Sequence, residues 1–270
     1  MIYKCLGIVL HRIKYSETSV ISKIYTERFG MCSFLVQGAR KKNAASKANL
    51  LQPLSLVELV AYHKENSGLH KMKELKNDYT FGSLQDNIAK STIALFLSEM
   101  MVRSIVEETP NKPLFNFLYQ SVKELDSIEN PTSFHLLFLV KLSKFLGFFP
   151  HKSSGQLPQN NGIENSGSDK EPEGTEKFFP SEELEGSLFF DLPEGNFVNK
   201  KPAHTYYLNP VLAKIFLQLI QLEFADLNEF FIERKNKKFL LEKIIDYYRL
   251  HISGLKEIKS YRVLEEVMMG

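Results

Sequence analysis

The sequence predicts an α+β fold, in which a small N-terminal β-barrel is followed by an α-helical bundle. Hydrophobic residues alternate with a period of two over much of the first eighty residues, and from Gln85 onward they repeat with the period of a helix. Charge divides in the same way. Residues 1–80 carry thirteen Lys and Arg against six Asp and Glu, whereas the whole chain has a net charge of only +2. We therefore expect two domains, residues 1–80 and residues 81–270.

Five segments of the first domain have the β-branched, aromatic or alternating residues that are typical of strands. Turn-forming residues separate them, and the segments are Ile2–Lys14, Ser19–Tyr25, Met31–Gln37, Pro53–His63 and His70–Asn77. Five short strands fit a small closed barrel, either SH3-like or an OB-fold. The OB-fold is the five-stranded one, and it is our prediction.

The second domain contains several recognisable helix starts. Asp86 can cap a helix that runs to about Glu107, and Pro113 suits the first turn of a helix that ends near Ser127. Thr132 or Ser133 can cap a third helix, which is apolar on nearly every face and is expected at the centre of the bundle. The later expected elements are a hairpin over 188–197, a helix capped by Asn209, a short helix capped by Asp226, and a long helix from Lys235 to His251.

A polar insertion interrupts the helical domain at about residues 151–180. Ser, Gly, Asn, Pro and Glu dominate this stretch. Such a composition cannot bury enough apolar surface to offset the entropy lost on ordering. We expect an exposed, mobile segment.

Cysteine usage argues against a metal centre. The two cysteines, Cys5 and Cys32, both lie in strand-like apolar surroundings, and no pair of histidines stands beside them at ligand spacing. We expect two buried, reduced thiols, no bound metal and no cofactor.

No segment resembles a membrane anchor or a secretory signal. The most apolar stretch, residues 134–149, is interrupted by Lys141 and Lys144. It falls short of the roughly 20 residues that a membrane helix needs. We expect a soluble, cytoplasmic protein.

No catalytic motif is present: the sequence has no Walker A pattern, no GxGxxG after a strand, no HExxH and no GxSxG. The strongest constellation is basic, in the small-residue loop that contains Arg40, Lys41, Lys42 and Lys47. Long cationic side chains on such a loop can follow a phosphate backbone without reading sequence.

Strand residues are further candidates for DNA binding. Lys23 and Tyr25 share one face of their strand, so that a cation and a platform for base stacking would stand together. Packing of Tyr25 against the barrel is an equally good interpretation. Arg12, Lys14 and Arg28 are weaker candidates.

Several blocks of the sequence together resemble the RecO family of bacterial recombination mediators. They are Gly7-Ile8-Val9-Leu10, Tyr15-Ser16-Glu17-Thr18-Ser19, Tyr25-Thr26-Glu27-Arg28-Phe29-Gly30, Gln37-Gly38-Ala39-Arg40-Lys41-Lys42, Leu51-Gln52-Pro53 and Tyr247-Tyr248-Arg249-Leu250-His251. The resemblance implies an N-terminal OB-fold, a helical C-terminal domain, binding of single- and double-stranded DNA, and annealing of complementary strands. It also implies three partners, namely RecR, single-strand-binding protein and, indirectly, RecA.

The resemblance has one clear departure and one further implication. Many members carry a four-cysteine zinc motif after the central helix, where this chain has its polar insertion, so zinc is not expected here. RecO-like proteins also contact the acidic, apolar-tipped tail of single-strand-binding protein. Such a tail needs an apolar groove beside a cation. The expected groove residues are Lys238, Lys243, Leu241 and Ile244, although most apolar residues of that helix are expected in the core.

Three functions remain open at this point. The first is a non-enzymatic DNA-binding and annealing protein that helps recombinase to replace single-strand-binding protein in gap repair. The second is an RNA-binding OB-fold adaptor, because OB-folds serve both nucleic acids. The third is a small-molecule enzyme in the helical domain, for which the sequence offers no convergent polar set.

Overall fold

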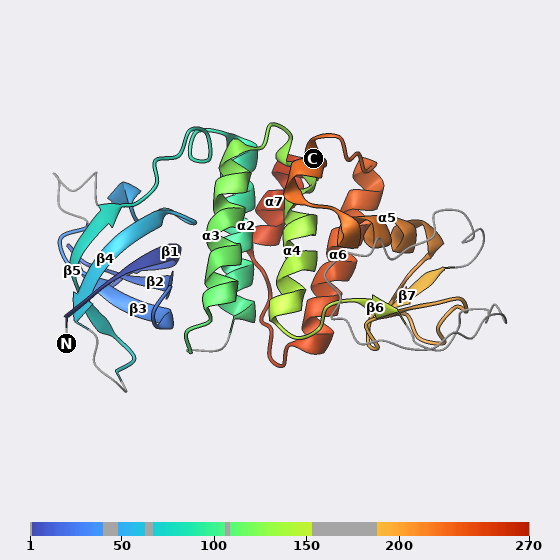
Figure 1. Ribbon diagram of the computed structural model, residues 1–270, viewed down its shortest axis with the longest axis horizontal. Helices are drawn as coiled ribbons and strands as arrows, with labels where there is room; N and C mark the ends of the chain where they lie inside the picture. Colours follow the sequence, from blue (N-terminus) through green and yellow to red (C-terminus); the bar gives the residue numbers. More distant parts are fainter. Residues whose placement is uncertain (1, 40–47, 63–66, 106–108, 153–187, 270) are drawn as a thin grey trace, which may run out of the picture.

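The computed structural model describes residues 2–39, 48–62, 67–105, 109–152 and 188–269 (Figure 1). A β-barrel at one end leads into a set of helices, and a small sheet lies at the opposite end. The predicted α+β fold is confirmed. Within the described ranges, none of the helices combines the length and apolar character that crossing a bilayer requires.

Five strands close the barrel in the order β1–β2–β3–β5–β4, so the expected five-stranded OB-fold is confirmed. They are β1 (Ile2–Lys14), β2 (Val20–Thr26), β3 (Gly30–Val36), β4 (Leu56–Tyr62) and β5 (His70–Asn77). The pairing of β3 with β5 is parallel, and the other pairs are antiparallel. β1 pairs with both β2 and β4, and the register of its β2 ladder shifts between Val9 and His11.

The barrel interior is filled by small and apolar side chains from all five strands. Gly7 is required there, because an added Cβ would lie 2.6 Å from Ile24 Cγ2 and 3.0 Å from Leu59 Cδ2. Cys5 and Cys32 are buried, free thiols, as expected. Burial raises the pKa of Cys5 to about 12, with a further contribution from Cys32, so this thiol stays protonated and unreactive.

The outer face of the barrel is also partly buried. Ile8, Leu10 and Tyr25 point outward into the same hydrophobic core as the helices. The helices nearest the barrel are α2 (Ile88–Ser104) and α3 (Lys112–Ser127) (Figure 1). One core joins the two parts, so packing does not mark a boundary between them. The division into two domains at residue 80 stays a prediction.

The central helix of the bundle is α4 (Phe134–Phe145), as expected, and most of its side chains are buried. It lies between α2 and α3 on one side and α6 on the other (Figure 1). The remaining helices are α5 (Pro210–Gln221), α6 (Arg234–His251) and α7 (Ser260–Met269). The sequence analysis did not predict α7, which packs against α2.

Several helix ends differ from the prediction by a few residues. Asn87, not Asp86, caps α2, because its side chain accepts a hydrogen bond from the Lys90 N–H at 3.1 Å. The helix ends at Ser104 rather than near Glu107. Neighbouring polar residues can each satisfy the same free N–H group, so sequence alone does not choose between them.

Two other helix starts differ in detail. A short 3₁₀ turn over Pro131–Ser133, capped by Asn130, precedes α4, and Ser133 stands at the N-cap position of α4 as expected but makes no side-chain hydrogen bond to the helix. Asp226 stands in the third position of the 3₁₀ helix Phe224–Asn228, where its carboxylate accepts from the N–H of the preceding cap residue, Glu223, at 2.9 Å. The cap at Asn209 is confirmed.

A four-stranded sheet lies at the far end, in the order β6–β8–β7–β9. Its strands are β6 (His151–Lys152), β7 (Phe189–Asp191), β8 (Asn196–Val198) and β9 (Tyr207–Leu208), so the expected hairpin is confirmed. The polar insertion expected at 151–180 lies outside the described residues except for His151 and Lys152, which form β6.

Aromatic packing holds this sheet to the helices. Phe190 is fully buried, with ring centroids 4.8 Å from Phe197, 4.8 Å from Phe216 and 5.5 Å from Tyr247. A shared aromatic core therefore fastens the described part of this region.

A carboxylate near the end of α3 fastens the segment that leads from the barrel into the first helix. Asp126 accepts hydrogen bonds from the N–H groups of Gly82 and Ser83, both at 2.9 Å, and of Leu84 at 2.7 Å. The Lys90 Nζ donates to the Asp126 carbonyl at 2.6 Å and to the Ser83 hydroxyl at 2.7 Å. These bonds join the linker, α2 and α3 into one unit.

We expect Asp126→Ala to lower the free energy of unfolding by about 3 kcal/mol, because hydrogen bonds to a charged acceptor contribute about 1.5–3 kcal/mol each. Chemical denaturation followed by circular dichroism measures the change. Asp86→Ala removes an exposed carboxylate of the same linker and should change stability little. Equal stabilities of the two variants would contradict this role for Asp126.

The stability of the folded protein should depend on pH through the same carboxylate. Burial raises the pKa of Asp126, but the hydrogen bonds from Gly82, Ser83, Leu84 and Tyr79 together lower it below its usual value. Its contribution to stability is therefore complete above the unfolded-state pKa of about 3.9 and is lost as the pH falls through the folded-state pKa. The melting temperature of Asp126→Ala should decline less than that of the wild type between about pH 5 and pH 3.

The packing of the small sheet leads to a further prediction. Phe190→Ala should lower the free energy of unfolding by about 3–5 kcal/mol, because it leaves a cavity among three aromatic rings. Treatment of the wild type with a chelator should leave its melting temperature unchanged. Phe231→Ala, which removes a phenylalanine that is 83% exposed, serves as the control. A chelator-induced loss of stability, or one zinc per chain by elemental analysis, would contradict the prediction.

Candidate nucleic-acid interface

The predicted basic loop is anchored on the barrel at both ends. Ala39 is buried in the barrel core, and the carbonyl oxygen of Ala48 accepts a hydrogen bond from the Arg12 guanidinium at 3.0 Å. Four expected DNA contacts in this loop lie outside the described residues and stay predictions: Arg40, Lys41, Lys42 and Lys47.

Three further basic residues lie on the surface of the barrel. Arg12 and Lys14 are exposed near the end of β1, and Lys14 pairs with the first residue of β2. Arg28 lies two residues after the end of β2, with its guanidinium carbon 4.5 Å from the ring centroid of Tyr3. The structure therefore places Arg12 beside Ala48, the residue directly after the basic loop. Arg28 lies at the other end of β2.

The expected stacking platform at Tyr25 is wrong. The Tyr25 side chain is 1% exposed, and its ring is stacked on Phe115 of α3 with centroids 6.3 Å apart. The alternative of packing within the barrel is not observed either, because Tyr25 lies on the outer face of β2 and belongs to the core that this face shares with the helices. Lys23 lies two residues earlier, is half-buried, and pairs in register with His11.

A cation beside an exposed aromatic occurs elsewhere on the barrel. Lys71 and Lys73 of β5 are exposed, and Lys71 pairs in register with Tyr62 of β4, which is 45% exposed. The sequence analysis missed these residues. The signal was present as an alternation, because the two lysines alternate along β5 with His70 and Met72, which are buried.

The predicted peptide groove on α6 needs correction. Leu241 and Ile244 are buried in the core, so they are unavailable to a partner. Lys238 forms an ion pair with Glu265 of α7. Of the four expected residues, Lys243 lines a cleft.

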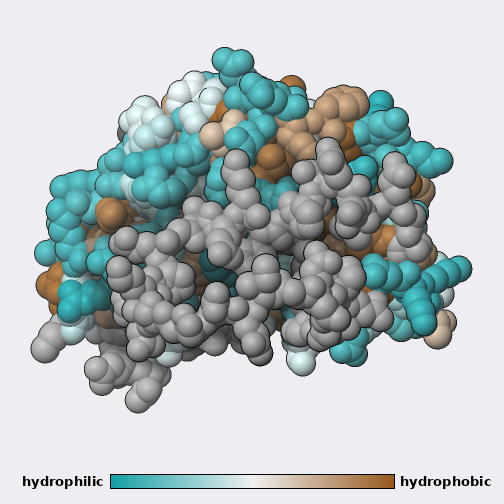
Figure 2. Space-filling model, turned by 45° about the vertical axis from the view of Figure 1, so that its right-hand side comes forward, coloured by the Kyte–Doolittle hydropathy of each residue, from teal (hydrophilic) through white to brown (hydrophobic). Residues whose placement is uncertain are grey.

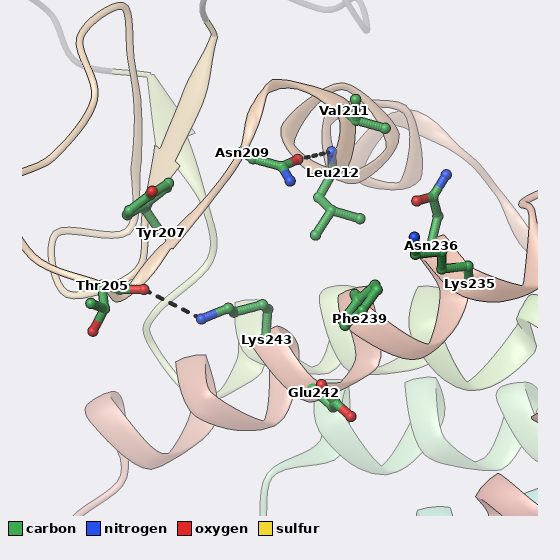
Figure 3. Close-up of a pocket in the computed structure, with 10 residues that line it drawn as sticks. All are labelled: Thr205, Tyr207, Asn209, Val211, Leu212, Lys235, Asn236, Phe239, Glu242 and Lys243. Carbon is green, nitrogen blue, oxygen red and sulfur yellow. Dashed lines mark hydrogen bonds between the residues drawn. The ribbon is translucent and has the colours of Figure 1, made fainter.

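That cleft lies between the start of α5 and one face of α6, and its volume is about 530 Å³ (Figure 3). Val211 and Phe239 line it and are 58% and 44% exposed. The Lys243 Nζ donates to the Thr205 carbonyl at 3.3 Å on one side, and Lys235 lies on the other. On the face shown in Figure 2, hydrophobic residues lie in patches between hydrophilic ones.

The described ranges contain no group of three or more His, Cys, Asp or Glu placed to hold a metal ion. Two of the histidines near the small sheet, His204 and His251, have other partners. The His204 Nε2 lies 3.1 Å from Asp191 Oδ2, and the His251 Nε2 lies 2.8 Å from the Leu192 carbonyl oxygen. The described residues of the barrel surface and of the cleft therefore offer cations and apolar side chains to a partner.

Two family models match nearly the whole chain. The model described as "Recombination protein O N terminal" matches residues 1–79, which include the barrel. The model described as "Recombination protein O C terminal" matches residues 85–262, which include most of the helical part.

Several curated proteins named "DNA repair protein RecO" are similar over almost their full length. The protein of Phocaeicola vulgatus is 34% identical over 268 residues, with 99% of both chains covered. That of Bacteroides fragilis is 35% identical over 269 residues, again with 99% of both chains covered. That of Flavobacterium psychrophilum is 32% identical over 266 residues, with 98% of both covered. The barrel, the helical part and these matches agree, and the chain belongs to the RecO family of DNA repair proteins.

Proposed function

We propose that this protein is a non-enzymatic recombination mediator that binds single- and double-stranded DNA and anneals complementary strands. In gap repair it helps the recombinase RecA to replace single-strand-binding protein, and it acts together with RecR. Its place of action is the bacterial cytoplasm, at the nucleoid. The observation that carries the proposal is an OB-fold barrel with a surplus of seven positive charges in a DNA repair family.

The basic barrel favours contacts with phosphates rather than with particular bases. In the sequence its cations are spread over β1, β5 and the segment 40–47. Such an arrangement neutralises a phosphate backbone and releases counterions without selecting a sequence. Annealing requires this property, because both strands must be held whatever their sequence.

An RNA-binding adaptor was the alternative function, and it is not supported. The family models describe a recombination protein, and the relatives are named as DNA repair proteins over the full length of the chain. We therefore retain only the DNA-binding proposal.

We propose further that the cleft between α5 and α6 receives the acidic tail of single-strand-binding protein. Its apolar lining of Val211, Leu212 and Phe239 suits the apolar tip of such a tail. Lys235 and Lys243 lie beside that lining, where they can meet carboxylates (Figure 3). The positive end of the α5 dipole also borders the cleft, which favours an anion.

DNA binding should depend on salt and not on sequence. If six phosphates of a single strand are contacted, log K should fall against log salt with a slope of about −4. A variant with Arg40, Lys41 and Lys42 all changed to Ala should show a slope less steep by about 2, because about 0.7 is lost per phosphate contact. Fluorescence anisotropy with labelled oligonucleotides measures both slopes.

The control for this variant changes three other exposed lysines, Lys144, Lys200 and Lys214, to Ala, and so removes the same charge outside the barrel. It should keep the wild-type slope. A flat salt response of the wild type would overturn the DNA-binding proposal, whereas equal losses in the two variants would mean that net charge alone drives binding.

Binding of the tail should depend on the cleft. Phe239→Ala and Lys243→Gln should each weaken the affinity for a synthetic tail peptide by about tenfold, which corresponds to roughly 1.4 kcal/mol. Lys238→Gln removes a charge from the same helix, outside the cleft, and should have little effect. Fluorescence anisotropy of the labelled peptide tests this on the full chain. Equal effects of Lys238→Gln and Lys243→Gln would point to general charge attraction instead.

A further inference from the structure

Four chain segments meet where the barrel touches the helices, and they bring several charges together. His11 of β1 and Lys23 of β2 pair in register on this side of the barrel. Glu99 and Arg103 lie one turn apart on α2, which packs against β1. α7 packs against α2, and its first residue, Ser260, bonds to Glu99.

The charges of the two domains are close enough to influence one another. Burial lowers the pKa of His11, Glu99 raises it, and Lys23 and Arg103 lower it further, so the pKa lies below its usual value. His11 therefore lies near cations from both β2 and α2. We name this group of residues, Lys23, His11, Arg103 and the adjoining Lys259, the junction.

The carboxylate at the junction is already engaged. Glu99 Oε2 accepts hydrogen bonds from the Ser260 N–H at 2.8 Å and from the Ser260 hydroxyl at 2.6 Å. Burial raises the pKa of Glu99, but these bonds, with the help of Arg103, lower it below its usual value. Glu99 is thus bonded to the first residue of α7 and lies beside Arg103.

Arg103 retains donors for another partner. Its guanidinium lies 3.7 Å from Glu99 Oε1, which is too long for a hydrogen bond, and its side chain is 31% exposed. Its Nε is buried, so a phosphate would meet the exposed end of the guanidinium. Lys259 stands exposed directly before α7.

The junction continues the basic surface of the barrel. Arg12 follows His11 on β1, and its guanidinium donates a hydrogen bond to the carbonyl oxygen of Ala48, directly after the basic loop. The described cations therefore lie on β1, β2, α2 and the segment directly before α7. Arg12 and Lys259 are exposed, Lys23 and Arg103 are half-buried, and their spread over separate elements suits an extended polyanion rather than a small anion.

We propose that the phosphate backbone of a bound DNA strand crosses this junction from the barrel onto the helical part, in contact with Lys23, Arg103 and Lys259. The inference rests on the proposed DNA binding and adds the path that the strand takes. It means that a short strand can occupy the barrel alone, whereas a longer one gains contacts with α2 and with the start of α7.

The test is a double variant of the full chain, Arg103→Gln with Lys259→Gln. If two phosphate contacts are lost, the salt slope for single-stranded DNA should become less steep by about 1.4. Affinity for a long strand at low salt should fall about tenfold, and affinity for a strand too short to leave the barrel should change little. Lys23→Gln, on a strand of the barrel, should reduce the slope by about 0.7 independently.

Controls separate the loss of a contact from the loss of charge or of fold. Lys200→Gln with Lys214→Gln removes two cations near the opposite end of the molecule and should keep the wild-type slope (Figure 1). Arg103→Lys keeps the charge and should restore most of the affinity, and melting temperatures verify folding.

Each result has a distinct meaning. If the wild type binds DNA and the junction variants keep its slope, the proposed path is wrong and the DNA-binding proposal stands. If the wild type binds no DNA, the DNA-binding proposal itself fails. If the control pair weakens binding as much as the junction pair, net charge explains the effect and the path is again overturned.

Discussion

The carboxylate of Asp126 is the interaction on which the arrangement of this molecule most depends. It accepts hydrogen bonds from three backbone N–H groups of the segment that leaves the barrel. The backbone carbonyl of Asp126 accepts a further hydrogen bond from the Lys90 Nζ of α2. Without these bonds, only the core that the barrel shares with the helices would hold the two parts together. With them, and with the shared core around Tyr25 and Phe115, the barrel and the helical part form one body.

That rigidity has consequences for DNA binding. The basic surface of the barrel and the cations of α2 and α7 keep a fixed relation only because the connection between them is fixed. A strand that contacts both parts then loses little additional entropy on binding, since the protein is already arranged. The cleft between α5 and α6 lies near the opposite end from the barrel, so a partner peptide and a DNA strand need not compete for one surface (Figure 1).

Sequence patterns predicted the fold well and the site only in part. Alternation and turn residues gave the five strands, and the apolar run gave the central helix, because both reflect local burial. They could not show that the outer face of β2 meets α3. This contact buries Tyr25, and the same kind of contact removes Leu241 and Ile244 from any groove. Which face of a strand is covered depends on tertiary packing. Both faces of β2 carry apolar residues, so the sequence does not show which face is covered.

Other misses have different physical causes. α7 has an amphipathic sequence, but its first residue is held by Glu99 from a helix that lies 161 residues earlier, and no local pattern reveals such a partner. Lys71 and Lys73 could have been found, because their alternation with buried residues is visible in the sequence. The residues of the loop at 40–47 stay predictions based on composition and on the anchoring of its two ends.

Hydrogen exchange at the backbone N–H groups of Gly82, Ser83 and Leu84 tests the central claim most directly. If Asp126 joins the barrel and the helices into one body, these three groups exchange only through global unfolding, as slowly as the core of α4. Fast exchange at the three groups, with α4 and the barrel strands still protected, would show that the linker opens locally. The two parts would then move independently, which would contradict the account.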